Sequence, residues 1–358
     1  VGTIQNLTSG QSTNDNTPTL TGVTEADSIV TIRDGNTVIG TTTSDASGNW
    51  SFTPAPALSE GSHSLTATVT DGAGNISPAA PPFVVVVDTL APAAPSITSV
   101  IDDQPGSTLL TNGQLTNDAQ PTLSGTTEAN AIVTIRSNGT IIGTANADGS
   151  GSWSFTPTNA LAQGENIFTV TATDAAGNTS GASASFTVLV DSVAPSAPVI
   201  LTVQDNTAPT TGPISNGQIS NESRPALSGT GEVGATITVL SDGQPIGTTI
   251  VGAGGTWNFT PSTALGNGLH TLTVTATDSA GNTSLPSGGF TYTVDTQAPA
   301  APVITQVADD VGPLTGNLNN GQATNDARPT LSGTAEANST VRIYDNGSFI
   351  GSITADST

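Results

Sequence analysis

Apolar and polar residues alternate along most of the chain, and the alternation is clearest in residues 268–277. There, Leu272, Val274 and Ala276 alternate with threonines, which is the period-two pattern of a strand with one buried face. Residues 204–223 are polar and predict a long loop. Short stretches of similar pattern, separated by turn residues, predict seven strands at residues 199–203, 225–230, 235–240, 246–251, 257–260, 268–277 and 289–294.

The pattern repeats along the chain with a nearly constant step. An Asp-x-Ala-Gly-Asn turn begins at residues 71, 174 and 278, so the step is 103 and then 104 residues. Three other motifs keep it: Val-Asp-x-x-Ala-Pro, Trp-x-Phe-Thr-Pro and Pro-x-Leu-x-Gly. A period near 100 residues is the size of an independent domain. We therefore predict modules at residues 1–88, 89–191, 192–295 and 296–358, the first without its N-terminal lead and the last truncated.

Seven short strands in one module, with Asp-Gly or Asn-Gly hairpin turns, predict an all-β chain of tandem immunoglobulin-like sandwiches joined head to tail in a rod. Trp50, Trp153 and Trp257 each begin one strand and are expected in the module cores. The last module lacks three of its seven strands. We expect residues 296–358 to expose an edge and much of their core, and to be marginally stable.

The charge of the chain narrows its possible partners. Five Lys and Arg residues stand against 28 Asp and Glu residues, and the net charge of −23 argues against binding to nucleic acid or an anionic membrane. No stretch approaches the roughly 20 apolar residues of a membrane helix, so membrane insertion is not expected. The chain has no cysteine, so the disulfide of antibody domains is missing. We expect a monomer whose partners are its own neighbouring modules.

The candidate chemistry lies where modules meet. Strand directions alternate in such a sandwich, so the loops after the second, fourth and sixth strands share one pole with the incoming linker. Carboxylates gathered there without Lys, Arg, His or Cys predict a Ca²⁺ site. The predicted junction ligands are Asp88, Glu128, Asp148, Asp174, Asp191, Glu232, Asp278, Asp295 and Glu336. A second set on the long loop at the opposite pole comprises Asp102, Asp103, Asp118, Asp205, Glu222, Asp309, Asp310 and Asp326.

Simpler interpretations exist for the same residues. An Asp before Ala-Gly-Asn can form an Asx turn, and an Asp before a linker can merely solvate it. His63 and His270 are replaced by Asn166 in the second module, so we interpret them as solvated strand residues rather than catalytic ones. The serines lie in turns with no neighbouring histidine, and no glycine-rich phosphate loop opens a helix. We therefore predict that the chain is not an enzyme.

The motif set resembles the bacterial Ig-like repeats of giant, type I-secreted adhesins and biofilm-associated proteins of Gram-negative bacteria. The resemblance rests on Pro-Thr-Leu-Ser-Gly, Trp-Ser-Phe-Thr-Pro, Thr-Asp-x-Ala-Gly-Asn and Val-Asp-x-x-Ala-Pro-x-x-Pro, and it covers essentially the whole chain. It implies an extracellular stalk on the bacterial cell surface, exported by a signal outside this sequence, with calcium near the junctions. Residues 251–255 depart from the pattern because they lack the aspartate found at Asp45 and Asp148.

The expected function is mechanical: calcium at each junction would stiffen a stalk used in adhesion or biofilm formation, with any host or matrix receptor bound by parts outside this sequence. Extracellular calcium sites of this kind bind at roughly 0.1–1 mM. Two alternatives remain open. The modules could themselves bind a glycan or a host receptor, or they could be accessory domains of a secreted hydrolase. A shortage of exposed aromatic clusters favours the stalk.

Overall fold

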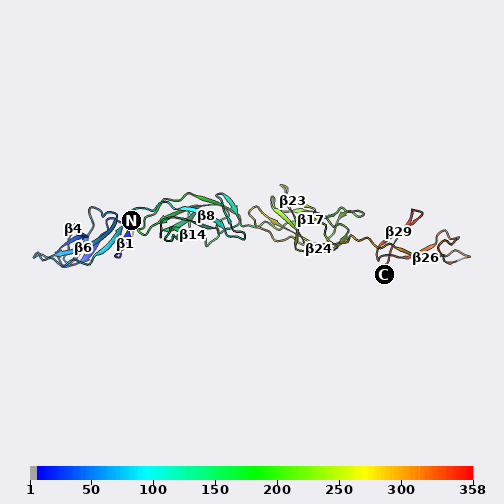
Figure 1. The fold of residues 1–358 in the computed structure, drawn as a ribbon, viewed down its shortest axis with the longest axis horizontal. Coiled ribbons are helices and arrows are strands. Elements are labelled where there is room, and N and C mark those ends of the chain that lie inside the picture. The colour runs from blue at the N-terminus through cyan, green and yellow to red at the C-terminus, as the bar shows by residue number, and fades with distance from the viewer. Residues whose placement is uncertain (1–5, 314, 358) are drawn as a thin grey trace. The chain divides into compact units, whose positions relative to one another are not determined.

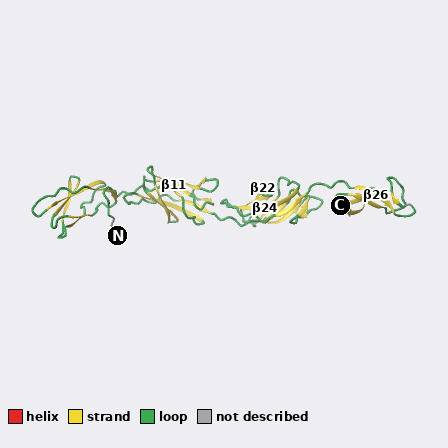
Figure 2. Cartoon of the chain, turned by 90° about the horizontal axis from the view of Figure 1, so that it is seen from below, coloured by secondary structure: helices red, strands yellow, loops and turns green. Residues whose placement is uncertain are grey.

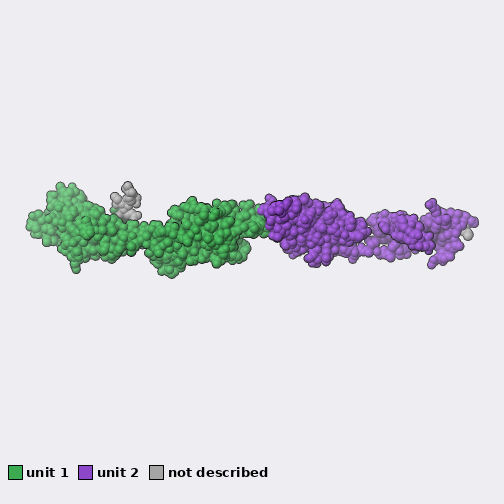
Figure 3. All heavy atoms as spheres, turned by 90° about the horizontal axis from the view of Figure 1, so that it is seen from above, with its two compact units in different colours: residues 1–195, 277–283 green, residues 196–276, 284–358 purple. Residues whose placement is uncertain are grey.

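The computed structural model describes residues 6–313 and 315–357, and within them the chain consists of strands and loops without a helix (Figures 1 and 2). The predicted all-β fold is confirmed. Contacts divide the chain into two compact units, residues 1–195 with 277–283 and residues 196–276 with 284–358 (Figure 3). In the described part of the chain, no helix is long and apolar enough to cross a membrane.

In the first unit, residues 96–190 form a complete two-sheet sandwich. One sheet has the order β14 (Ser152–Phe155), β11 (Thr122–Thr126), β8 (Ser96–Asp102) and β9 (Thr108–Leu109). The other has the order β10 (Gln114–Thr116), β16 (Phe186–Val190), β15 (Gly164–Thr173), β12 (Ile132–Ser137) and β13 (Thr140–Asn146). Alternation along the strands directs apolar residues of both sheets into one core, in which Leu123, Phe168 and Val170 are fully buried.

The same unit contains a less complete sandwich at residues 11–87. Its larger sheet has the order β1 (Gln11–Thr13), β7 (Phe83–Val87), β6 (Gly61–Thr70), β3 (Ile29–Asp34) and β4 (Thr37–Thr43). Opposite it lie only β2 (Leu20–Val23) and β5 (Asn49–Phe52). Among the described residues no counterpart of β8 covers β2, and the buried core cluster is smaller, with Leu58, Leu65, Val85 and Val87.

The second unit repeats the complete sandwich. Its sheets have the orders β18 (Gly212–Pro213), β17 (Val199–Asp205), β20 (Ala226–Thr230), β23 (Thr256–Phe259), and β19 (Gln218–Ser220), β25 (Phe290–Val294), β24 (Gly268–Thr277), β21 (Thr236–Ser241), β22 (Gln244–Ile250). All seven strands predicted here are present to within two residues. The predicted loop at residues 204–223 is wrong in part, because it contains β18 and β19. These strands are too short and too polar to show an alternating pattern, and β19 gains its order from parallel pairing with β25.

The second unit also contains strands at residues 303–354, which form two small sheets. One has the order β27 (Gly316–Asn317), β26 (Val303–Asp309) and β28 (Thr330–Thr334), and the other pairs β29 (Thr340–Asp345) with β30 (Ser348–Thr354). Leu331 is 39% exposed, whereas its repeat equivalents Leu123 and Leu227 are 0% and 2% exposed. The predicted exposure of core positions in this segment is confirmed, and its marginal stability stays a prediction.

Candidate functional site at the module joints

The linker that follows each sandwich is anchored to that sandwich by backbone and side-chain hydrogen bonds. The Asp88 N–H donates to the Thr13 carbonyl at 2.9 Å. Its carboxylate accepts the Leu90 N–H at 3.1 Å, which caps the linker backbone in an Asx turn. The Glu60 carboxylate accepts the Thr89 N–H at 3.1 Å. Asp88 therefore already has a structural role at the start of the linker.

The same three bonds recur at the two later linkers. Those of the second linker are Asp191 N–H to Thr116 O at 2.9 Å, Val193 N–H to Asp191 Oδ1 at 3.2 Å and Ser192 N–H to Gln163 Oε1 at 3.0 Å. Those of the third are Asp295 N–H to Ser220 O at 2.9 Å, Gln297 N–H to Asp295 Oδ1 at 3.0 Å and Thr296 N–H to Asn267 Oδ1 at 3.1 Å. Glu60, Gln163 and Asn267 were missed by the sequence analysis. They could have been found from the repeat, because the same position carries a side chain with an acceptor oxygen in all three modules, although only Glu60 is charged.

The turn after the sixth predicted strand is built by its own aspartate. The Asp174 Oδ1 atom accepts the N–H groups of Ala176 and Asn178, both at 2.9 Å, and its Oδ2 atom accepts the Asn178 side-chain amide at 2.9 Å. Asp278 makes the equivalent bonds to Ala280 and Asn282, at 2.8–2.9 Å. The Asx turn considered from the sequence is thus present.

The asparagine of this turn also reaches the linker of the preceding module. The Asn178 Nδ2 atom donates to the Asp88 carbonyl oxygen at 2.8 Å. The Asn282 Nδ2 atom donates to the Asp191 carbonyl oxygen at 2.7 Å, and residues 277–283 belong to the same compact unit as Asp191. Each of these linkers is therefore held from both sides, through its N–H by one module and through its C=O by the next.

A second contact accompanies this bond. The Gly177 α-carbon lies against the Asn14 side chain, so that a Cβ atom there would be 3.6 Å from Asn14 Nδ2. A Cβ atom on Gly281 would be 3.5 Å from Asn117 Nδ2. Both glycines have positive φ, +96° and +100°, which favours glycine over any other residue. The turn thus packs against the preceding module as well as bonding to its linker.

The first module contains the same turn motif at residues 71–75, and in the described part of the chain no preceding linker or module contacts it. Asn75 Nδ2 donates to Asp71 Oδ2 at 2.6 Å, and no bond from it to a linker is found in the described part of the chain. Asn75 is exposed, whereas Asn178 and Asn282 are half-buried. No atom would lie within 4 Å of a Cβ on Gly74. The comparison shows that a turn at a joint gains a hydrogen bond to the preceding linker and packing against the preceding module.

Three of the predicted junction acids, Glu128, Asp148 and Asp174, share one pole of the second module, but among the described residues they form no cluster placed to hold a metal ion. Ile132 pairs with both Thr173 and Asn146, which places the loops of Glu128, Asp148 and Asp174 at the same end of the sandwich. Glu128 is exposed. The Asp148 carboxylate accepts the Ser150 hydroxyl and the N–H groups of Ser150 and Ser152, and these bonds, the hydroxyl first, lower its pKa. Glu232, Asp295 and Glu336 are exposed as well.

Buried acids occupy the long-loop position in each module that contains it. Asp118 is 3% exposed and accepts the N–H groups of Asp103 and Gln120, both at 2.8 Å. Asp102 accepts the Thr116 hydroxyl at 2.7 Å. These bonds from backbone and hydroxyl donors explain how the carboxylates are buried without a positively charged partner.

The later modules repeat this arrangement. Asp205 accepts the Ser220 hydroxyl at 2.6 Å, and the Glu222 carboxylate accepts the Asn206 N–H at 2.9 Å. Burial of the phenol, followed by the charges of Glu222 and Asp205, raises the pKa of Tyr292. In residues 303–328, Asp309 accepts the Thr324 hydroxyl and the Val311 N–H, Asp326 accepts the Arg328 N–H, and Asp310 is exposed.

The acidic side chains are of the type that binds calcium, but they are not placed around a common point. Carboxylate and carbonyl oxygens are the ligands that calcium prefers. Within the described residues, however, no group of three or more His, Cys, Asp or Glu side chains is placed to hold a metal ion. The turn and long-loop carboxylates are engaged by N–H and O–H donors instead. The calcium site stays a prediction, and the side-chain positions described here do not form it.

The two histidines are not solvated as expected. His63 is 7% exposed, with Nδ1 2.6 Å from Asp34 Oδ2 and Nε2 2.8 Å from the Ser59 carbonyl oxygen. His270 Nε2 lies 2.8 Å from the Gly266 carbonyl oxygen. Asn166 donates to the Ala162 carbonyl at 2.8 Å, also four residues earlier. The shared contact with this loop carbonyl explains why histidine and asparagine occupy the same position.

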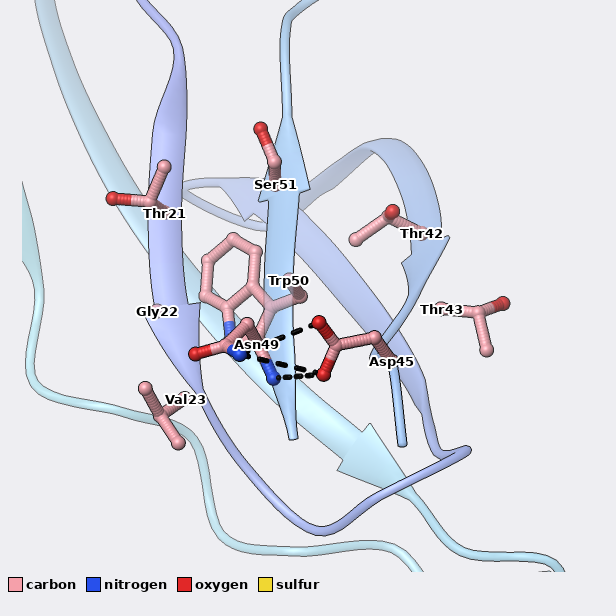
Figure 4. Close-up of a pocket in the computed structure, with 9 residues that line it drawn as sticks. All are labelled: Thr21, Gly22, Val23, Thr42, Thr43, Asp45, Asn49, Trp50 and Ser51. Atoms are coloured by element: carbon pink, nitrogen blue, oxygen red, sulfur yellow. Dashed lines mark hydrogen bonds between the residues drawn. The ribbon is translucent and has the colours of Figure 1, made fainter. Parts of the chain in front are cut away.

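The core tryptophan prediction is confirmed for Trp153 and Trp257, which are 3% and 1% exposed. Trp50 is only half-buried and lies under a pocket (Figure 4). The reason is the missing cover: β8 places the Ser96 carbonyl beside Gly125 and Trp153, and the described part of the first module has no such strand. The pocket is lined by Thr21, Gly22, Val23, Thr42, Thr43, Asp45, Asn49, Trp50 and Ser51.

The three sandwiches on either side of these joints are matched by one family model. The model described as "Bacterial Ig-like domain" matches residues 6–89, 93–192 and 196–296. The chain belongs to the bacterial Ig-like domain family. The matched ranges follow one another along the chain, so this member consists of tandem bacterial Ig-like repeats. No curated protein matches it.

Several solved structures are similar to the chain. Fibronectin(III)-like modules of Clostridium thermocellum CbhA are 18% identical, with 53% of this chain and 93% of that chain covered and a TM-score of 0.34. A tetra-tandem repeat in the extending region of a large adhesion protein is 23% identical, with coverage of 84% and 76% and a TM-score of 0.26. The BSP domain of a biofilm associated protein is 15% identical, with coverage of 75% and 57% and a TM-score of 0.21.

Proposed function

We propose that this chain is a non-catalytic stalk segment of an extracellular bacterial surface adhesin, which holds a binding region away from the cell. The observation that carries the proposal is the two-sided anchoring of the linkers at Asp88 and Asp191. A flexible linker between independent binding modules gains nothing from an ordered backbone. A stalk does, because its reach depends on each joint keeping its geometry.

The charge of the chain suits this use. A net charge of −23 on 358 residues makes neighbouring copies repel each other, which favours separate rather than aggregated stalks. The Ig-like fold supplies strength without disulfides, because each complete sandwich has its own buried core. Membership of the bacterial Ig-like family supports a location at the cell surface.

The test is an in-frame deletion series in the bacterium that produces the protein. Removing residues 89–191 joins Asp88 to Ser192 and keeps the linker motif, and removing residues 89–295 shortens the chain further. The stalk proposal expects attachment to a surface to fall stepwise with length, while antibodies against residues 192–295 still label intact cells carrying the shorter deletion.

Purified residues 1–358 provide the counter-test. If the modules themselves bind a glycan or receptor, the purified chain will compete and reduce attachment of the wild-type cells. A stalk segment will not compete. Loss of attachment on competition, or attachment independent of length, would contradict the proposal.

Calcium-dependent stiffening remains a separate proposal about the same joints. It is supported by the acidic character of the pole, where Glu128, Asp148 and Asp174 lie on neighbouring loops. Its test is whether the melting midpoint rises in calcium, and whether it rises less in Glu128→Gln.

A further inference from the structure

We propose that the asparagine of the Asp-x-Ala-Gly-Asn turn is a latch that orders the preceding linker, so that the joints at Asp88 and Asp191 hold without a metal ion. The inference deepens the proposed stalk function and rests on it. The latch consists of Asn178 bound to the Asp88 carbonyl, and of Asn282 bound to the Asp191 carbonyl.

Both N–H groups of the latch's side-chain amide are used. Its two N–H groups serve two acceptors: Asn178 donates to Asp174 Oδ2 at 2.9 Å and to the Asp88 carbonyl at 2.8 Å. Asn282 donates to Asp278 Oδ2 at 2.8 Å and to the Asp191 carbonyl at 2.7 Å. The aspartate fixes the orientation of the amide, and the amide then presents its second N–H to the linker. The two N–H donors of one amide group are what allow a single side chain to serve both acceptors here.

The amide also matches the electrostatics of the joint. The linker aspartate and the turn aspartate are both acidic, and the described part of the joint brings no Lys or Arg to them by an ion pair. The asparagine amide is neutral and donates to both the linker and the turn. It therefore lets these two acidic segments lie close together without a cation. This is a different solution from the calcium bridge that the same acids suggest in the sequence.

The first module shows the turn without its linker. Asn75 keeps the bond to Asp71 but is exposed, and the space beside Gly74 is open. In the joined turns, Gly177 lies in van der Waals distance of Asn14 and Gly281 in that of Asn117. The bond to the linker and the packing against the preceding module therefore occur together. This pairing identifies the preceding linker as the partner of the turn.

The test measures order across the joint in residues 1–358. The chain has no cysteine, so Thr37→Cys and Thr140→Cys, both at exposed hairpin positions, take spin labels at two defined sites. Pulsed electron paramagnetic resonance then gives the distribution of distances between the first and second modules, in excess chelator and in calcium. The variants are Asn178→Ala, and Asn178→Asp, which keeps the shape but cannot donate.

Asn75→Ala is the matched control, because it removes the same bond within a turn but touches no linker in the described structure. We expect the wild type and Asn75→Ala to give one narrow distribution in chelator. Both Asn178 variants should increase the population outside the main peak about five-fold, the effect of losing a net hydrogen bond of about 1 kcal/mol.

Two results would overturn the latch. One is a wild-type distribution in chelator as broad as that of Asn178→Ala, which would assign the order to a metal ion. The other is an Asn178→Ala or Asn178→Asp distribution as narrow as that of Asn75→Ala. Neither result depends on attachment of cells, so a failed latch and a failed stalk proposal are distinguishable.

Discussion

Gly229 in the third module has no room for a side chain, and replacing it with alanine is expected to destabilise that module strongly. A Cβ atom there would lie 1.9 Å from the Val199 carbonyl oxygen and 2.3 Å from the Trp257 ring. Neither neighbour can yield easily. Val199 is paired in β17 opposite Thr230, and Trp257 is 1% exposed.

The magnitude follows from overpacking. Adding a methylene to a filled core costs about 1–3 kcal/mol, and a contact with a backbone oxygen places Gly229→Ala near about 3 kcal/mol. For a domain of this size, each kcal/mol lowers the melting midpoint by about 4–8 °C. We therefore expect the transition of this module to fall by about 12–24 °C. The first three modules each have a single tryptophan, so a fluorescence-detected melt resolves the shifted fraction.

Gly22→Ala is the matched control in the first module. The three atoms nearest to a Cβ there would all belong to the Trp50 ring, at 2.6–2.7 Å, whereas the nearest atom at Gly229 is a backbone oxygen. Trp50 is half-buried and borders a pocket, so its ring can move outward (Figure 4). We expect a shift of less than about 1 kcal/mol. Equal shifts for Gly22→Ala and Gly229→Ala would refute the argument that the strand β17 makes the site rigid.

Two further predictions concern protons and calcium. Burial lowers the pKa of His63, but the hydrogen bond that its ring donates to the Asp34 carboxylate, aided by the Ser59 carbonyl and the Asp34 charge, outweighs burial and raises the pKa overall. The stabilising contribution is therefore fully present below the unfolded value of 6.5 and is lost as pH rises through the raised folded pKa. His63→Asn, which copies Asn166, should flatten the change in melting midpoint between about pH 5.5 and 8.5, and an unchanged slope would contradict this assignment. If the junction acids bind calcium with a Kd of roughly 0.1–1 mM, calcium at about 1 mM should stabilise the chain by about 0.4–1.4 kcal/mol, less in Glu128→Gln. A melting midpoint that does not change with calcium would contradict calcium binding by the junction acids.

The strands were predictable because their signal is local. Alternation in residues 268–277 and the Trp-x-Phe-Thr-Pro motif each report which face of a strand is buried, and the structure has β24 and β23 there. β18 and β19 were not predictable in this way. Residues 212–213 and 218–220 carry little apolar pattern. Their order comes from pairing with the nearby β17 and with β25, which is distant in sequence.

The repeat drew attention to Asp88, Asp174 and the turn that follows it, and the structure gives these residues hydrogen-bonding roles. Their binding of calcium stays a prediction. Charge, however, directed the interpretation toward a cation, whereas the contacts of these aspartates are with N–H groups of the chain. The orientation of a side-chain amide relative to a carbonyl 90 residues away leaves no trace in composition or spacing.

The position of Asn178 also explains why the turn and the linker motif recur together. The Asp-x-Ala-Gly-Asn turn needs the aspartate to orient the amide and the glycine, at φ +96°, to let the backbone turn toward the preceding module. The linker needs its own aspartate to fix the carbonyl that the amide binds, through the N–H bond to Thr13 and the Asx turn to Leu90. Without its partner, the turn keeps its internal bond but stays exposed, as at Asn75. A chain that repeats both motifs at the same step can therefore set the geometry of each joint from the sequence of its two neighbours alone.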